Sequence, residues 1–236
     1  MARRWGQWER ARNTLSWVKA AVFVVALAPV GWLAWKGVMG DLGANPLEAI
    51  THATGDWTLR FLLATLAVTP LRALTGLNAL IRFRRMLGLY AFFYGTLHLF
   101  TYLWFDQFFS WPEILRDIAK RPFITAGVAA FLLMVPLAAT STAGMIRRLG
   151  GARWRALHRL VYAAAILGVV HYWWLVKADV SLPRTYAAVL GVLLAARLWV
   201  AYRKRSTQPP RKVMALTKTM NHEDPKDTKQ SRVTPS

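Results

Sequence analysis

Residues 86–105 read MLGLYAFFYGTLHLFTYLWF, a run of twenty residues without Asp, Glu, Lys or Arg. A helix of about 20 predominantly apolar residues spans the hydrocarbon core of a bilayer. Because no water is available at that depth, such a segment must satisfy its backbone hydrogen bonds internally, as a helix does. The stretch therefore predicts a membrane-spanning helix, and it carries one histidine, His98, at membrane depth.

Similar apolar stretches occupy most of the remaining chain, so we expect an all-α integral membrane bundle of six helices. The other five expected spans are residues 16–35, 57–75, 122–140, 154–176 and 183–202. We expect the first of them to be retained, because its apolar run is longer than the ~7–15 residues usual for a signal peptide.

The spans divide the chain into a basic N-terminus, residues 1–15, a transmembrane domain, residues 16–202, and a tail, residues 203–236. The tail is polar and rich in Lys, Thr and Pro, so we expect it to be disordered.

The composition agrees with a membrane protein. Of 236 residues, 55% are hydrophobic and 18% are charged, and the mean hydropathy is +0.27. There are 31 Lys and Arg against 11 Asp and Glu, for a net charge of +20. Nucleic-acid-binding proteins can be as basic, but they are not normally this apolar, which argues against a nucleic-acid partner.

The basic residues are distributed unevenly between the loops. Residues 1–15, 72–85, 141–155 and 203–236 together carry 21 basic and 4 acidic side chains, whereas the alternate loops carry 6 basic and 7 acidic ones. Because positive charge favours the cytoplasmic side, both termini are expected to be cytoplasmic. The surplus charge is therefore mainly a topology signal, with the anionic lipid bilayer as its ordinary partner.

The histidines are the candidate functional groups. The chain contains no cysteine, which excludes thiolate chemistry, cysteine-ligated iron–sulfur clusters and C-x-x-C-H haem attachment. Three histidines, His98, His158 and His171, fall within expected spans, where ionisable side chains are costly and often functional. We expect no Asp or Glu at membrane depth. Non-covalent haem ligation fits this set, although a lone histidine can also bond a backbone carbonyl as a packing residue.

Helix geometry places two of these histidines at one depth. His98 lies 13 residues after Arg85, and His171 lies 13 residues after His158. At 1.5 Å per residue both separations are about 20 Å, so His98 and His171 are expected near the outer face, where two imidazoles could hold one six-coordinate haem iron. His158 lies about 140° around an ideal helix from His171 and has Arg85 at its depth on the other span. Its role stays open.

Arg82 and Arg85 are candidates to bind a flavin phosphate or haem propionates, although topology alone explains basic residues there. Two other functions also stay open. One is a stand-alone haem reductase of ferric iron or another outer acceptor. The other is a small transporter with structural histidines, which is weakened by the expected lack of carboxylates and of an inverted repeat.

Several motifs together resemble the MsrQ (YedZ) family of the ferric reductase-like transmembrane group, over about residues 10–202. These motifs are Arg84-Arg85-Met86-Leu87-Gly88-Leu89 followed by His98, Leu137-Ala138-Ala139-Thr140-Ser141, Trp154-x-x-Leu157-His158-Arg159-Leu160-Val161-Tyr162, and His171-Tyr172. The resemblance implies a multi-pass protein of the bacterial inner membrane. It also implies one or two b-type haems held by His98, His158 and His171, and an association with FMN.

The same resemblance implies a partner and an electron source. Family members pass electrons from the quinone pool to a periplasmic molybdopterin enzyme, MsrP, which reduces methionine sulfoxide in oxidised periplasmic proteins. The chain would then be the electron-transfer subunit of an oxidoreductase and not its catalytic subunit.

The chain departs from the wider ferric reductase group in two respects. Its tail of about 34 residues is too short for a nucleotide-binding domain, and Arg85 stands where that group usually has a second histidine on the third span. Electrons are therefore expected from a quinol or a separate reductase, and the number of haems stays open.

Overall fold

The computed structural model describes residues 2–176 and 179–206. Most of the expected disordered tail, and His222 with it, lies outside these residues. The chain divides into two compact units, residues 1–196 and residues 197–236. In the described part of the second unit, the Arg203 guanidinium lies over the Trp199 ring at 4.9 Å. Apart from the last residues of α9, which extend past residue 196, the features below belong to the first unit.

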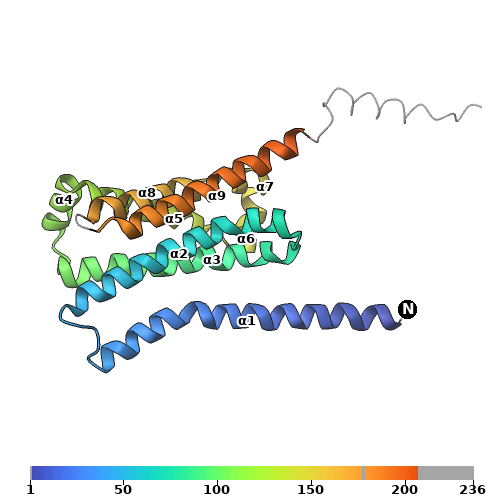
Figure 1. Cartoon of the computed structure of the whole chain (residues 1–236), viewed down its shortest axis with the longest axis horizontal. Helices are drawn as coiled ribbons and strands as arrows, with labels where there is room; N and C mark the ends of the chain where they lie inside the picture. Colours follow the sequence, from blue (N-terminus) through green and yellow to red (C-terminus); the bar gives the residue numbers. More distant parts are fainter. Residues whose placement is uncertain (1, 177–178, 207–236) are drawn as a thin grey trace, which may run out of the picture. The chain divides into compact units, whose positions relative to one another are not determined.

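All regular structure in the described residues is helical, as expected (Figure 1). The helices are α1 (Ala2–Val38), α2 (Pro46–Thr75), η1 (Asn78–Leu80), α3 (Ile81–Thr101), the π-helical turn η2 (Tyr102–Asp106), α4 (Trp111–Lys120), α5 (Pro122–Ala139), α6 (Ala143–Leu149), α7 (Gly151–Leu157), α8 (Leu160–Leu175) and α9 (Ser181–Ser206).

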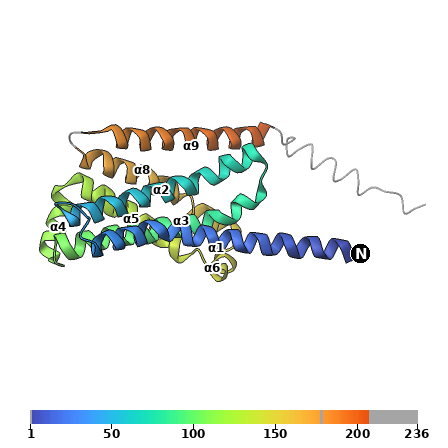
Figure 2. The same ribbon diagram turned by 60° about the horizontal axis from the view of Figure 1, so that its bottom comes forward.

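Four of these helices form a ring. α2 packs along α3 and α5 packs along α8, while α3 also contacts α5 and α2 also contacts α8. α3 and α8 therefore lie diagonally opposite each other in the ring. They do not pack closely against each other, so there is room between them for a cavity. We call the end of this ring near α4 the α4 end and the opposite end the α6–α7 end (Figures 1 and 2).

Aromatic residues fill the core on the α2–α3 side and fasten α1 to it. The Phe61 ring stacks on Tyr90 and Tyr94 at centroid distances of 5.5 and 5.4 Å. The Tyr90 hydroxyl donates to the Phe23 carbonyl at 2.8 Å, and the Tyr94 hydroxyl donates to the Ala26 carbonyl at 2.9 Å. Because buried hydroxyls need partners, these two bonds fix α1 against α3.

Five helical segments among the described residues are long and apolar enough to cross a membrane. They are Ser16–Val38, Pro46–Thr75, Asn78–Asp106, Pro122–Ala139 and Ser181–Arg203. The all-helical membrane class is thus confirmed, whereas the count of six spans is not.

The expected span 154–176 is interrupted. α7 ends at Leu157 and α8 begins at Leu160, after a turn in which the Arg159 N–H donates to the Ala156 carbonyl three residues back. α8 has 16 residues, so it is about 24 Å long against a hydrocarbon core of roughly 30 Å. Hydropathy alone does not reveal this break, because residues on both sides of it are apolar.

α2 begins 11 residues earlier than expected, at Pro46 rather than at Trp57. The Asn45 side chain accepts from the Glu48 N–H at 3.2 Å, and Pro46 occupies the first turn, a combination that favours a helix start. As a result Asp56 lies inside a helix long enough to span the membrane. The expectation that no carboxylate occurs at membrane depth stays a prediction, because α2 has 30 residues and a membrane crossing needs only about 20.

A hydrogen bond precedes α9. The Ser181 N–H donates to Asp179 Oδ1 at 2.9 Å, and this bond holds the pKa of the exposed Asp179 carboxyl below its ordinary value.

Candidate functional site

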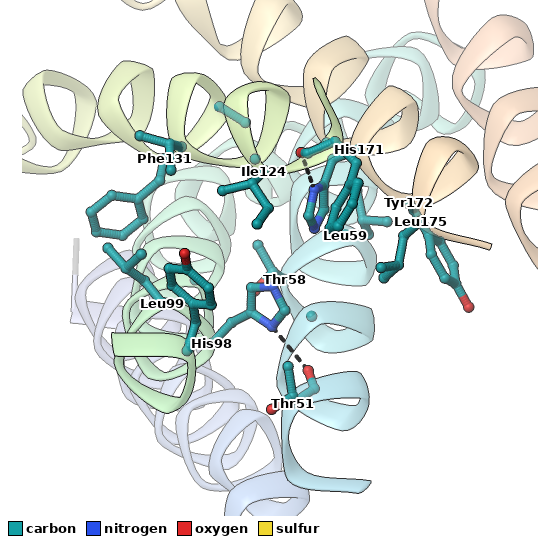
Figure 3. Close-up of a pocket in the computed structure, with 18 of the residues that line it drawn as sticks. Thr51, Thr58, Leu59, His98, Leu99, Ile124, Phe131, His171, Tyr172 and Leu175 are labelled. Atoms are coloured by element: carbon teal, nitrogen blue, oxygen red, sulfur yellow. Dashed lines mark hydrogen bonds between the residues drawn. The ribbon is translucent and has the colours of Figure 1, made fainter. Parts of the chain in front are cut away.

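A cavity of about 480 Å³ lies inside the ring of α2, α3, α5 and α8, a size typical of cofactor sites (Figure 3). Both His98 of α3 and His171 of α8 border it. Most of its wall is apolar and suited to excluding water. The apolar lining residues include Leu59, Leu62, Leu99, Val128, Phe131 and Met134.

The two histidine rings lie next to each other across this cavity. Their centroids are 6.0 Å apart, and their planes are inclined at 75°. His98 and His171 are thus at the same height on diagonal helices, as their spacing along the sequence predicted. The helices that carry them are not close packing partners, since α3 packs mainly against α2 and α8 packs mainly against α5.

Each ring is held by a backbone carbonyl of that partner helix. His98 Nδ1 donates to the Thr51 carbonyl of α2 at 2.9 Å, and His171 Nδ1 donates to the Phe123 carbonyl of α5 at 2.6 Å. A carbonyl can only accept, so the proton lies on Nδ1 and the neutral ring keeps its lone pair on Nε2. Metal-binding histidines are commonly oriented in this way.

The free sides of both rings point into the gap between them (Figure 3). Two metal–imidazole bonds of about 2 Å, together with the radii of two imidazole rings, add up to roughly 6 Å. The observed centroid distance of 6.0 Å therefore suits two imidazoles that bind one metal ion from opposite sides.

The donor set indicates which kind of metal group fits. Within the described ranges, no group of three or more His, Cys, Asp or Glu side chains is arranged to hold a metal ion. Two protein ligands suffice only for a metal that brings its own equatorial ligands, as haem iron does. The residues present therefore fit a haem better than a bare Zn²⁺, which takes three or four protein ligands.

Polar side chains gather where the cavity meets the α4 end, and Asp56, Asp106 and Arg121 were not among the residues expected at the site. Asp56, Tyr102, Asp106 and Arg121 border the cavity here. Each of two helices carries an Asp–Arg pair four residues apart, a spacing that could have been recognised in the sequence. Asp56 Oδ2 lies 3.5 Å from Arg60 Nη2, and Asp117 Oδ1 lies 3.2 Å from Arg121 Nε.

Both pairs are tied to tyrosines. Arg60 Nε donates to the Tyr186 hydroxyl of α9 at 3.1 Å. Asp117 accepts from the Tyr102 hydroxyl at 3.2 Å and from Gln107 Nε2 at 3.1 Å. The η2 turn that carries Tyr102 directly follows the helix of His98, and such π-helical turns are frequent at functional sites.

His158 lies apart from this cavity, at the α6–α7 end. Its ring stacks on Trp154 at a centroid distance of 3.8 Å, and its Nδ1 bonds the Trp154 carbonyl at 3.1 Å. Its Nε2 is buried and has no hydrogen-bond partner among the described residues. The structure therefore does not bring His158 together with His98 and His171, and the Leu137 carbonyl lies close enough to the His158 ring to interact with it.

The expected basic residues are also at the α6–α7 end. Arg82 and Arg85 are both exposed, and neither borders the cavity. The arginine of α3 that interacts electrostatically with His158 is Arg84.

Comparison with known proteins identifies the group to which this arrangement is similar. The family model described as ferric reductase like transmembrane component matches residues 53–169, a range that includes His98 and His158 and ends two residues before His171.

Three curated relatives extend this similarity over most of the chain, and all are named protein-methionine-sulfoxide reductase heme-binding subunit MsrQ. The protein of Herminiimonas arsenicoxydans is 55% identical over 194 residues, 81% of this chain and 89% of its own length. That of Rhodospirillum rubrum is 59% identical over 187 residues, covering 79% and 90%. That of Azospira oryzae is 57% identical over 199 residues, covering 84% and 85%.

Proposed function

This chain belongs to the MsrQ family of haem-binding subunits, and we propose that it carries electrons through the membrane to a methionine sulfoxide reductase. The observation that supports this proposal most directly is the pair of imidazoles 6.0 Å apart on the diagonal helices α3 and α8. The chain would act as the electron-transfer subunit, and a partner would carry out the reduction of methionine sulfoxide.

In this proposal His98 and His171 would hold the iron of a b-type haem. When bound, haem would supply one-electron redox chemistry. The chain's own residues hold each Nε2 toward the cavity through the Nδ1 bonds to Thr51 and Phe123. The apolar wall excludes water.

A second haem position is proposed at His158, as an inner ligand. Its buried Nε2 without a hydrogen-bond partner supports this, because an unpaired buried nitrogen is costly unless a ligand uses it. FMN is proposed near Arg82 and Arg85, which are exposed and do not border the cavity. The electron source is proposed to be quinol from the membrane.

The finer topology is also part of the proposal: six crossings, both termini cytoplasmic, in a bacterial inner membrane. α8 would be the short sixth crossing, and its burial against α5 reduces the need to match the full bilayer. Because the native chain has no cysteine, single cysteines report topology unambiguously. Gln107→Cys should react with a membrane-impermeant maleimide added outside intact cells, and Arg148→Cys should react only after lysis.

The docking surface for the periplasmic MsrP-type molybdopterin reductase is proposed over residues 105–121. Phe108 and Phe109 adopt φ values of +46° and +57°, a costly left-handed conformation for bulky residues. Phe108 is 79% exposed, and Trp111 at the start of α4 is 64% exposed. A strained turn that presents aromatic rings suits a binding surface.

An absorption spectrum before and after dithionite tests the haem proposal. The purified protein should show the sharp reduced bands of b-type haem, and His98→Ala should lose the bis-histidine signal, while His222→Ala serves as the matched control. Full haem content in His98→Ala would refute the ligand assignment. A featureless visible spectrum from wild-type protein purified from cells supplied with haem would favour a transporter with structural histidines.

A further inference from the structure

We propose that Gly55 of α2 and Gly127 of α5 are positioning residues, each of which leaves one helix carbonyl open so that a haem-ligating histidine can anchor its Nδ1 there. The inference rests on the proposed ligation by His98 and His171. It adds the reason why these two rings can reach a backbone carbonyl of an adjacent helix.

The first half of the arrangement lies between α2 and α3. His98 Nδ1 bonds the Thr51 carbonyl at 2.9 Å, and Gly55 is the residue four positions after Thr51. A Cβ atom at Gly55 would lie 3.1 Å from both Nδ1 and Cε1 of His98. The imidazole therefore occupies the space next to α2 that a side chain at position 55 would need.

The second half repeats this pattern between α5 and α8. His171 Nδ1 bonds the Phe123 carbonyl at 2.6 Å, and Gly127 is the residue four positions after Phe123. A Cβ atom at Gly127 would lie 2.8 Å from His171 Nδ1, 3.0 Å from Cε1 and 3.2 Å from Cγ. The contact is tighter here than at Gly55, so the ring would have to move.

Helix geometry explains the four-residue spacing. In an α-helix the carbonyl of residue i accepts from the N–H of residue i+4. The Cβ of residue i+4 is tilted toward the helix N-terminus and so covers the same carbonyl. With glycine at i+4 the carbonyl is uncovered, and its second lone pair can accept a bond from another helix.

Glycine is unfavourable inside a helix relative to alanine, so a helical glycine needs a compensating reason. Other helical glycines meet different neighbours: a Cβ at Gly95 or Gly168 would lie 3.0 Å from the side chain of Met134 or Leu59, and a Cβ at Gly31 or Gly191 would meet nothing within 4 Å. What distinguishes Gly55 and Gly127 is that the crowding atoms belong to a histidine ring bonded to the carbonyl four residues earlier. The same arrangement of glycine, open carbonyl and histidine ring occurs between α2 and α3 and between α5 and α8.

The test compares Gly127→Ala and Gly55→Ala with Gly191→Ala, a matched helical control next to open space. Each full-length protein is purified with its haem, and haem retention, the low-spin electron paramagnetic resonance signal and the midpoint potential are measured. Gly127→Ala should weaken haem retention by roughly ten- to hundred-fold and alter the low-spin signal, as loss of a ligand's supporting contact does. Gly55→Ala should keep its haem with a shifted potential, and Gly191→Ala should match the wild type.

Thermal unfolding of the haem-free proteins distinguishes positioning from packing. Without haem the histidine ring is free to turn away from the new methyl group, so the unfolding midpoints should stay close to that of the wild type. An equal destabilisation of the haem-free protein would assign the glycines to helix packing and overturn the proposal. If Gly127→Ala does not accumulate, Gly55→Ala decides the question.

The inference would also be overturned if Gly55→Ala, and Gly127→Ala where it can be purified, had the same low-spin signal and midpoint potential as the wild type. This result differs from a failure of the proposed ligation. In that case His98→Ala or His171→Ala would retain the full haem signal, whatever the glycine variants show.

Discussion

The two ends of the helical ring hold their histidines in opposite ways. At the α4 end, His98 and His171 bond carbonyls that lie 47 and 48 residues away in the sequence, on other helices. At the α6–α7 end, His158 bonds the carbonyl of Trp154, four residues back on its own helix. A ring anchored across helices is fixed with respect to the whole bundle. A ring anchored to its own helix is fixed only with respect to that helix.

This difference predicts how sharply each site defines a metal position. Two cross-anchored rings face each other over one cavity, whereas His158 has a free Nε2 but no second histidine opposite it among the described residues. We expect the site at the α4 end to bind haem tightly in one geometry. We expect the site at the α6–α7 end to bind it more weakly and in more than one geometry. The predictions below test that contrast, beginning with the largest expected effect.

Replacing the histidines one at a time should separate the two sites most clearly. His171→Ala should abolish the low-spin bis-histidine signal, because a single remaining imidazole cannot complete a six-coordinate iron. His158→Ala should leave that signal in place and remove only the haem held at the α6–α7 end. Electron paramagnetic resonance and a haem count per polypeptide measure both. Equal losses in the two variants would show that the sites are not independent.

Asp117→Asn should affect the α4 end alone. The Asp117 carboxylate accepts from Tyr102 and Gln107 and pairs with Arg121, and its removal should lower the free energy of unfolding by roughly 1–3 kcal/mol. Since Tyr102 and Arg121 border the cavity, the midpoint potential of the bis-histidine haem should shift as well. Glu113→Gln, which breaks only the exposed pair with Arg116, is the control. A potential equal to that of the control would contradict this prediction.

Trp154→Phe should act on the other end with a smaller effect. It keeps an aromatic ring against His158 but removes the bond from Trp154 Nε1 to the Thr140 carbonyl at 3.0 Å. The expected loss of stability is about 1 kcal/mol, measured as a lower thermal midpoint. The bis-histidine signal should remain that of the wild type, and a change in it would mean that the two ends are coupled.

The smallest effect is expected for the exposed arginines. Arg82→Gln and Arg85→Gln should leave the bis-histidine haem signal and the unfolding midpoint unchanged, since neither side chain borders the cavity. If FMN binds at this end, flavin retention should fall in one or both variants, measured by released fluorescence. Flavin content equal to the wild type in both would remove these residues from the flavin site.

Much of the fold follows from hydropathy and helix signals. α5 runs from Pro122 to Ala139 against an expected 122–140, because a proline begins the apolar run and Thr140 ends it. The start of α2 was misplaced because its first turns are polar, although the Asn45–Pro46 cap marks it. The break between α7 and α8 depends on one turn with three-residue hydrogen bonds, which periodicity does not reveal.

The candidate site, like the fold, could be predicted from the sequence only in part. The equal heights of His98 and His171 follow from helical rise alone. Their carbonyl anchors and the glycines beside them do not, because these contacts depend on which helices pack together and in what register. Asp56 lies inside α2 and not in the loop before it, because α2 begins at Pro46 and not at the expected Trp57.

The diagonal placement of α3 and α8 has a consequence for biogenesis. The α2–α3 and α5–α8 pairs each bury their own seam, so each pair can form as a separate hairpin on leaving the translocation machinery. A haem held by His98 and His171, as proposed, would link the two pairs beyond the contacts that α3 makes with α5 and α2 makes with α8. Delivery of the haem would then complete the joining of two separately formed halves.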